Sequence, residues 1–254
     1  MNAFLEDLRG LTHTGTRRDA LRVGGKISLA AAVASVPFLK PGRAMAQSTD
    51  GDLGILNYAL TLEYLERAFY RQAEDTGLIP SANASLFETI KTHEEQHVEL
   101  LAGAISAAGG DPVVYTDDDF SFDAFLGDFA SIATLAQGLE DTGVRAYKGQ
   151  AAAIMNADTL TVALQIHSVE ARHAAAIRVL RGKQGWIPGR QAGAAAPIAP
   201  VYAGEDNTEQ GGVELTTALS GYTREEITEA FDEPFTRAEV LAIAGPFITG
   251  DEGD

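Results

Sequence analysis

The chain has 254 residues, a formal net charge of -17 and no cysteine. Without cysteine it can form no disulfide, thiolate nucleophile or thiolate-bound metal site. The negative charge argues against nucleic acids and anionic membrane surfaces as partners, because both repel an acidic protein. Hydrophobic residues make up 45% of the sequence, which is enough for a packed core.

The first 46 residues have the features of an export signal. The run Thr16-Arg17-Arg18-Asp19-Ala20-Leu21-Arg22 resembles a twin-arginine signal, and an apolar stretch at 27–39 and the small-x-small site Ala44-Met45-Ala46 follow it. The apolar stretch is shorter than the roughly 20 residues that span a membrane. We therefore expect 1–46 to be a signal peptide, the twin-arginine export machinery to be a partner, and the mature chain to reach the periplasm or the extracellular space. The alternative is an amphipathic helix that stays attached.

Helical periodicity dominates the next 130 or so residues. Glycine and proline divide this region, with Gly77 and Pro80 after the first helix, Gly109-Gly110 after the second and Gly182 after the fourth. The expected helices are 52–75, 83 or 85 to 108, 123–155 and 158–181.

The lengths of the connections predict the topology. Short turns join the first helix to the second and the third to the fourth, so each pair forms an antiparallel hairpin. The middle connector, 111–122, reaches about 40 Å when extended. The second helix is about 38 Å long. The connector can therefore run the length of the bundle, and the sequence predicts an all-α, antiparallel four-helix bundle over 52–182 with one long crossover.

The remaining residues, 183–254, are expected to form a linker and a short helical extension. The segment 183–212 is rich in Gly, Ala and Pro and is predicted to lie over the surface. Thr223-x-x-Glu226 and Thr236-x-x-Glu239 are capping boxes, which predict helices ending at Asp232 and near Gly245. This extension is too short for a core of its own, so it packs on the bundle or on a neighbouring subunit, and a homo-oligomer stays open.

Acidic and histidine residues interrupt the apolar seam of each long helix near its middle. The second helix carries Glu94-x-x-His97 and the fourth carries Glu170-x-x-His173, and each pair lies on one face where it can hold one ion. The first and third helices each carry a single glutamate with a tyrosine seven residues later, Glu63 with Tyr70 and Glu140 with Tyr147. We interpret the tyrosines as core residues or hydrogen-bond partners of the glutamates.

The two hairpins repeat this pattern, since Glu94 follows Glu63 by 31 residues and Glu170 follows Glu140 by 30. Four carboxylates buried at one level would cost several kcal/mol each, whereas two divalent ions would balance their charge. The predicted metal ligands are Glu63, Glu94, His97, Glu140, Glu170 and His173.

Three further residues on these helices invite comparison with the predicted ligands. Glu66 is the alternative to Glu63, which we prefer because only Glu63 has the tyrosine at +7. We expect His93 to be exposed and His167 to be a structural histidine with its hydrogen bonds satisfied.

This ligand pattern resembles that of ferritin-like di-iron and di-manganese carboxylate proteins over 52–182. The resemblance implies a ferritin-like fold with two metal ions. The wider chain, with its export signal and the tail from Glu233 to Phe247, is similar to exported ferritin-like domain proteins related to desiccation-associated proteins. That second resemblance implies no settled activity.

Carboxylate and imidazole ligands suit iron or manganese as the two ions. The leading hypothesis is a dinuclear oxidoreductase of the cell envelope that acts on peroxide, oxygen or ferrous iron in stress defence. The alternative is a non-enzymatic, metal-stabilised structural or desiccation-protective protein. Iron storage is a third hypothesis, which the 72 residues after the fourth helix disfavour because storage needs a closed shell of subunits.

Overall fold

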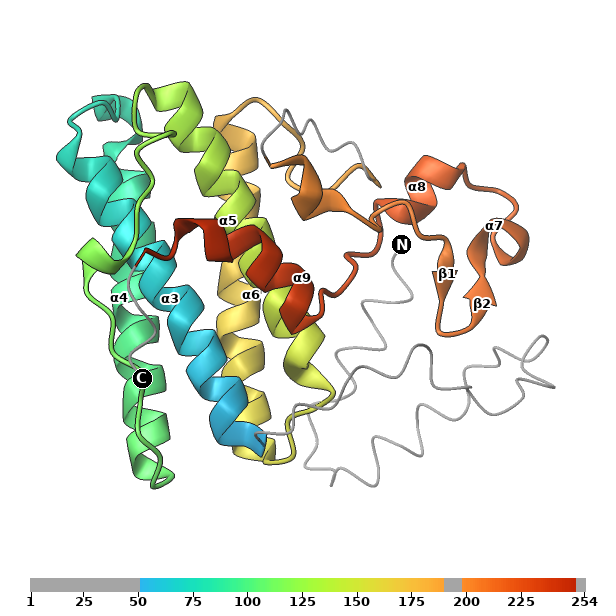
Figure 1. Ribbon diagram of the computed structural model, residues 1–254. Coiled ribbons are helices and arrows are strands. Elements are labelled where there is room, and N and C mark those ends of the chain that lie inside the picture. Colours follow the sequence, from blue (N-terminus) through green and yellow to red (C-terminus); the bar gives the residue numbers. More distant parts are fainter. Residues whose placement is uncertain (1–50, 190–197, 250–254) are drawn as a thin grey trace, which may run out of the picture. The chain divides into compact units, whose positions relative to one another are not determined.

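The computed structural model describes residues 51–189 and 198–249, and within them four long helices lie side by side (Figure 1). The predicted signal peptide lies outside these residues. The long helices are α3 Gly51–Asp75, α4 Ser81–Ala107, α5 Phe129–Ala151 and α6 Ala157–Leu180. The pairs α3 with α4, α5 with α6, and α3 with α5 are in contact. The all-α bundle is thus confirmed. None of the helices in the described ranges has the length and apolarity needed to cross a membrane.

The crossover between α4 and α5 is longer than predicted, because α5 begins at Phe129 and not near Asp123. Asp128 caps the helix by accepting a hydrogen bond of 2.8 Å from the backbone N–H of Ser131. The crossover contains the 3-10 turn η1, Asp117–Asp119. Arg67 and Arg71 of α3 both pair with the first aspartate of this turn, at 2.9 and 3.0 Å, and so hold the crossover against α3.

The end of α5 was also predicted too late, since the helix ends at Ala151 and not at Met155. Asn156 caps α6 and has an extended backbone, with ψ 125°. The Asp52 carboxylate accepts hydrogen bonds from the backbone N–H groups of Met155 and Asn156, at 2.8 and 2.7 Å. This pairing ties the α5–α6 turn to the start of α3.

The segment after α6 is partly buried, which corrects the prediction that 183–212 lies over the surface. Around the 3-10 turn η3, Ala199–Tyr202, a buried apolar cluster forms from Ile187, Ile198, Val201 and Tyr202. Gly138 of α5 permits this approach, since a Cβ there would lie 2.7 Å from the side chain of Ile198. The apolar residues of this segment are too widely spaced to show a period in the sequence.

A buried arginine of α5 fixes the same segment. Arg145 donates hydrogen bonds to the backbone carbonyls of Val201, Ala203 and Glu233. Its Nε also lies 3.1 Å from the Glu205 carboxylate. Burial raises the pKa of Glu205 to about 7, against the attraction of Arg145. The desolvation of this ion pair therefore outweighs its attraction, as is common for buried pairs.

The C-terminal extension packs on the bundle, one of the two arrangements expected. It contains a hairpin, short helices and a final 3-10 turn: β1 Glu209–Gln210, β2 Val213–Glu214, α7 Leu215–Ala218, α8 Arg224–Thr228, α9 Arg237–Ala244 and η4 Gly245–Phe247. Both predicted capping boxes are present, although α8 ends at Thr228 and not at Asp232. Phe235, Val240 and Ala244 join the bundle core. Gly149 of α5 permits this contact, since a Cβ there would lie 1.8 Å from the carbonyl oxygen of Phe235.

Candidate metal centre

The structure brings all six predicted ligand residues together in the middle of the bundle. They form two overlapping groups, and within each group one ligand atom per residue lies within 4.8 Å of the others. The first group is Glu63, Glu94, His97 and Glu170, and the second is Glu94, Glu140, Glu170 and His173. Glu94 and Glu170 belong to both groups, so the two hairpins contribute equivalent sets of residues. All six residues are buried, and the four glutamates are 0% exposed.

His97 faces the carboxylates of the first group. Its Nδ1 lies 3.0 Å from Glu63 Oε2, 3.1 Å from Glu94 Oε2 and 3.3 Å from Glu170 Oε1. Three carboxylates from three different helices thus converge on one imidazole nitrogen. This convergence follows from the placement of all four residues at the same level of the seam.

His173 has the equivalent place in the second group. Its Nδ1 lies 3.0 Å from Glu94 Oε1 and 3.2 Å from Glu140 Oε2. Its Nε2 lies 2.9 Å from Nδ1 of His93, and the two rings stack with their centroids 5.2 Å apart. His93 is half-buried, so the expectation that it is exposed is wrong. Its contact holds the His173 ring with Nδ1 toward the carboxylates, as partners of metal-binding histidines do.

The two tyrosines bind the glutamates of the opposite hairpin. Tyr70 of α3 donates a hydrogen bond to Glu140 Oε1 of α5, and Tyr147 of α5 donates one to Glu63 Oε1 of α3. The sequence analysis paired each tyrosine with the glutamate seven residues before it on the same helix. In the structure each tyrosine instead binds the glutamate of the facing helix. The exchange arises because α3 and α5 lie against each other across the bundle. It leaves one oxygen of each glutamate for the centre.

Glu66 is a fifth carboxylate at this centre, although the sequence treated it as an alternative to Glu63. It is 3% exposed and lies against Gly143 of α5. A Cβ at Gly143 would be 3.0 Å from Glu66 Oε1 and 3.1 Å from Glu170 Oε2. Glu66 therefore occupies space that only a glycine on the facing helix leaves open. Its position one turn after Glu63, on the same helix face, is the signal that could have shown it.

The carboxylates are poorly suited to carry charge in the absence of a cation. Burial and the negative charges of its neighbours raise the pKa of Glu66 well above its ordinary value, and the same two causes act on Glu170. Burial raises the pKa of Glu94 to about 7, against the neighbouring histidines His173 and His97, which lower it. These shifts show that the cluster holds more carboxylates than its own cations can balance.

The pKa values of the two ligand histidines are also raised, but in a histidine this favours the charged form. Burial alone lowers the pKa of His173, but the nearby carboxylates of Glu140 and Glu94 raise it to about 11. Burial also lowers the pKa of His97, but its carboxylate partners outweigh burial and raise it well above its ordinary value. Burial raises the pKa of Glu63, but the hydrogen bond and charge of His97 outweigh it and leave the pKa low. In the metal-free chain, protons on the imidazoles supply the positive charge that cations would bring.

Several buried ligand atoms also lack a hydrogen-bond partner among the described residues. They are Glu94 Oε1, Glu140 Oε2, both carboxylate oxygens of Glu170 and His173 Nδ1. Some of them lie about 3 Å from one another without hydrogen-bond geometry, as His173 Nδ1 and Glu94 Oε1 do. The atoms thus converge on common points, and a buried polar atom without a partner is costly. Two cations, each held by carboxylates and one imidazole, would satisfy them, so the residues fit a dinuclear metal centre.

Comparison with known families identifies the domain that contains this cluster. The family model of the ferritin-like domain matches residues 51–183. The chain belongs to the ferritin-like domain family. The ferritin-like domain comprises α3 to α6 and so contains all six predicted ligands together with Glu66. The segment from η3 to η4 lies beyond the matched residues. No curated protein matches the chain.

Proposed function

We propose that the ferritin-like domain holds two iron or manganese ions and carries out redox chemistry on peroxide, oxygen or ferrous iron in the cell envelope. The observation that carries this proposal is the pair of buried ligand groups that share Glu94 and Glu170. Glu63 and His97 would complete one ion site, and Glu140 and His173 the other. When bound, two such ions supply reversible one-electron steps at adjacent positions.

The protein side chains would orient and tune this chemistry. Tyr70 and Tyr147 hold one oxygen of Glu140 and Glu63, which fixes the rotation of each carboxylate. His93 holds the ring of His173 in the same way. With both ions bound, an ionised Glu66 would add a negative charge where four carboxylates already balance two divalent ions. This extra charge favours the oxidised ions, because they carry more positive charge.

The burial of the centre restricts the substrate to a small molecule. The four glutamates of the two ligand groups are 0% exposed, whereas His97 is 8% and His173 is 5% exposed. Solvent therefore comes closest on the side of the two ligand histidines, where half-buried His93 of α4 stacks on His173 of α6. Peroxide, oxygen and ferrous ion are small enough to reach a centre buried to this degree. The envelope location is supported by the Arg17-Arg18 pair and the Ala44-Met45-Ala46 site of the sequence.

Metal analysis and turnover measurements test this function. Protein purified after export by its native host should contain about two equivalents of iron or manganese, since each ligand group holds one ion. It should consume peroxide or oxidise ferrous ion. His173→Gln should lower metal affinity or turnover by about 10–100-fold and leave the bundle folded. His167→Gln is the matched control, because this half-buried histidine lies on α6 outside both ligand groups.

The non-enzymatic alternative gives a different result in the same experiment. If the ions only neutralise the carboxylates, His173→Gln should mainly lower the melting temperature, through weaker ion binding to the folded state. Wild-type protein loaded with iron or with manganese should then show no turnover with peroxide or with oxygen and ferrous ion. That outcome would refute the oxidoreductase proposal and leave the structural role.

A further inference from the structure

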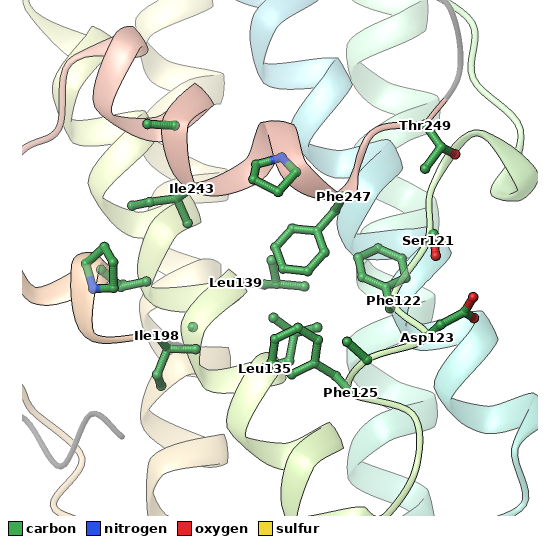
Figure 2. A pocket seen from close by; sticks show the side chains of 16 residues that line it. Ser121, Phe122, Asp123, Phe125, Leu135, Leu139, Ile198, Ile243, Phe247 and Thr249 are labelled. Carbon is green, nitrogen blue, oxygen red and sulfur yellow. The ribbon is translucent and has the colours of Figure 1, made fainter. Parts of the chain in front are cut away.

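A cavity lies apart from the metal centre, between α5, the α9–η4 segment and the crossover (Figure 2). Its volume is about 580 Å³, which is within the usual range of small-molecule sites. Its walls are mostly apolar and include Phe122, Phe125, Leu135, Leu139, Ile243 and Phe247. None of the predicted metal ligands lines it.

Aromatic rings form one continuous part of the wall. Phe122 and Phe247 stack with their centroids 5.4 Å apart, and Phe125 and Phe247 lie 5.8 Å apart at a tilted angle. Figure 2 shows these three side chains next to one another in the wall of the cavity. Such a surface favours a ligand with a flat ring, because offset or edge-to-face ring contacts add to the burial of apolar area.

The charges at the cavity exclude an anionic ligand. Asp123 is the one charged residue among the described residues that line it, and Ser121 and Thr249 add hydroxyl groups. Figure 2 places these three residues on one side of the cavity and Ile198 on the other. A carboxylate or phosphate group would meet no basic side chain there. It would also be repelled by Asp123 and by the net charge of -17.

Backbone contacts build the walls of this cavity from segments that are far apart in the sequence. Ser121 donates its backbone N–H to the carbonyl oxygen of Phe247 at 2.9 Å, and Thr249 donates to that of Asp119 at 2.8 Å. Ile198 reaches the wall because Gly138 has no side chain in its way. The cavity is therefore formed by the fold and does not depend on the rotamer of one side chain.

We propose that this cavity binds an uncharged, largely hydrocarbon small molecule that carries an aromatic or other flat ring. The apolar walls supply the affinity, and the three phenylalanines favour the ring. The hydroxyl groups of Ser121 and Thr249 can form one hydrogen bond with the ligand. Binding in this cavity requires neither the metal ions nor their redox chemistry.

Two fluorescent probes of matched shape test the proposed ligand class. N-phenyl-1-naphthylamine is uncharged, and 8-anilino-1-naphthalenesulfonate is its anionic counterpart. Titration of the full chain with the uncharged probe should give a saturable rise in fluorescence with one site per chain. The anionic probe should bind at least about tenfold more weakly, a difference of roughly 1.4 kcal/mol. Absence of saturable binding of the uncharged probe, or equal affinity for both probes, would overturn the proposal.

Substitutions of two alanines on α9 test where the probe binds. Ala242 is exposed and lines the cavity, so Ala242→Phe should fill it from the rim and weaken binding at least about tenfold. Ala238 is exposed on the same helix but does not line the cavity, so Ala238→Phe should bind as the wild type does. Ala124→Phe fills the cavity from the crossover and replaces Ala242→Phe if circular dichroism shows that variant to be unfolded. Unchanged binding in a folded cavity-filling variant would refute the assignment. The outcome is independent of any turnover at the metal centre.

Discussion

Gly143→Ala tests the geometry of the metal centre with the smallest change in the chain. Gly143 lies in α5, and a Cβ at this position would be 3.0 Å from Glu66 Oε1 and 3.1 Å from Glu170 Oε2. Both distances are shorter than ordinary van der Waals contacts, so one or both carboxylates must shift by a few tenths of an ångström. The added methyl group would therefore press first on the carboxylates of Glu66 and Glu170, which supply its three nearest atoms.

The expected effect differs between the metal-free and the metal-bound chain. Alanine is about 1 kcal/mol more favourable than glycine inside a helix, and unbound carboxylates can move aside. We therefore expect the metal-free variant to be as stable as the wild type or up to about 1 kcal/mol more stable. Ligand distances at a bound metal tolerate only about 0.2 Å. Displacement of Glu170, which belongs to both ligand groups, should lower metal affinity by about 10–100-fold, or roughly 1.4–2.8 kcal/mol.

Chelator competition and thermal unfolding, each measured with and without metal, give the two quantities. Gly103→Ala on α4 is the matched control, because nothing lies within 4 Å of a Cβ at that position. The control should gain a similar helix stability and keep its metal affinity. A Gly143→Ala variant whose metal affinity stays within about twofold of the wild type would contradict the placement of Glu170 as a shared ligand.

Three further predictions concern ion number, pH and export. Glu94→Ala should lose both ions, because Glu94 belongs to both ligand groups, whereas Glu63→Ala should retain about one equivalent in metal analysis. The pKa of Glu205 rises from 4.5 unfolded to about 7 folded, so stability is lost as pH rises through this range. Glu205→Gln removes this loss, so the melting temperature of the variant minus that of the wild type should be higher at pH 8 than at pH 5. A difference in melting temperature that does not change with pH would count against the raised pKa of Glu205. Replacing the Arg17-Arg18 pair with lysines should leave the precursor in the cytoplasm, and normal export in a fractionation assay would show the twin-arginine interpretation to be wrong.

The bundle was predictable because its signals are local and repeated. Each long helix carries an apolar seam, and glycine, proline or a capping residue marks its end. The start of α5 was less predictable, because Asp123 and Asp128 can each cap a helix and only the latter does so. The choice depends on tertiary packing, since Phe122, immediately before Asp123, is buried in the core. The buried segment around η3 was missed because its anchor, Arg145, binds backbone carbonyls, which leave no pattern in a sequence.

The six ligand residues were predictable as a set because two Glu-x-x-His pairs and two single glutamates fall in apolar seams at equivalent spacing. The roles within the set were not. Glu94 and Glu170 belong to both groups because of the positions of their helices relative to the other two, which the sequence does not give. The half-buried position of His93 follows from the approach of α6, which no feature of α4 alone reveals. His167 was expected to have its hydrogen bonds satisfied, but its Nε2 has no partner among the described residues.

The internal repeat also explains why the centre is not fully symmetric. Glu140 follows Glu63 by 77 residues, and at the same interval Gly143 follows Glu66. One hairpin thus supplies a carboxylate where the other supplies open space, and Glu66 fills that space. His93 breaks the symmetry a second time, because the residue 76 positions later is Val169. Of the two ligand histidines, His173 alone has an imidazole partner on its outer nitrogen within 51–189 and 198–249. Two ions held by the shared carboxylates would consequently meet unequal surroundings, so their affinities for the centre would differ, because partners of the ligands tune metal affinity.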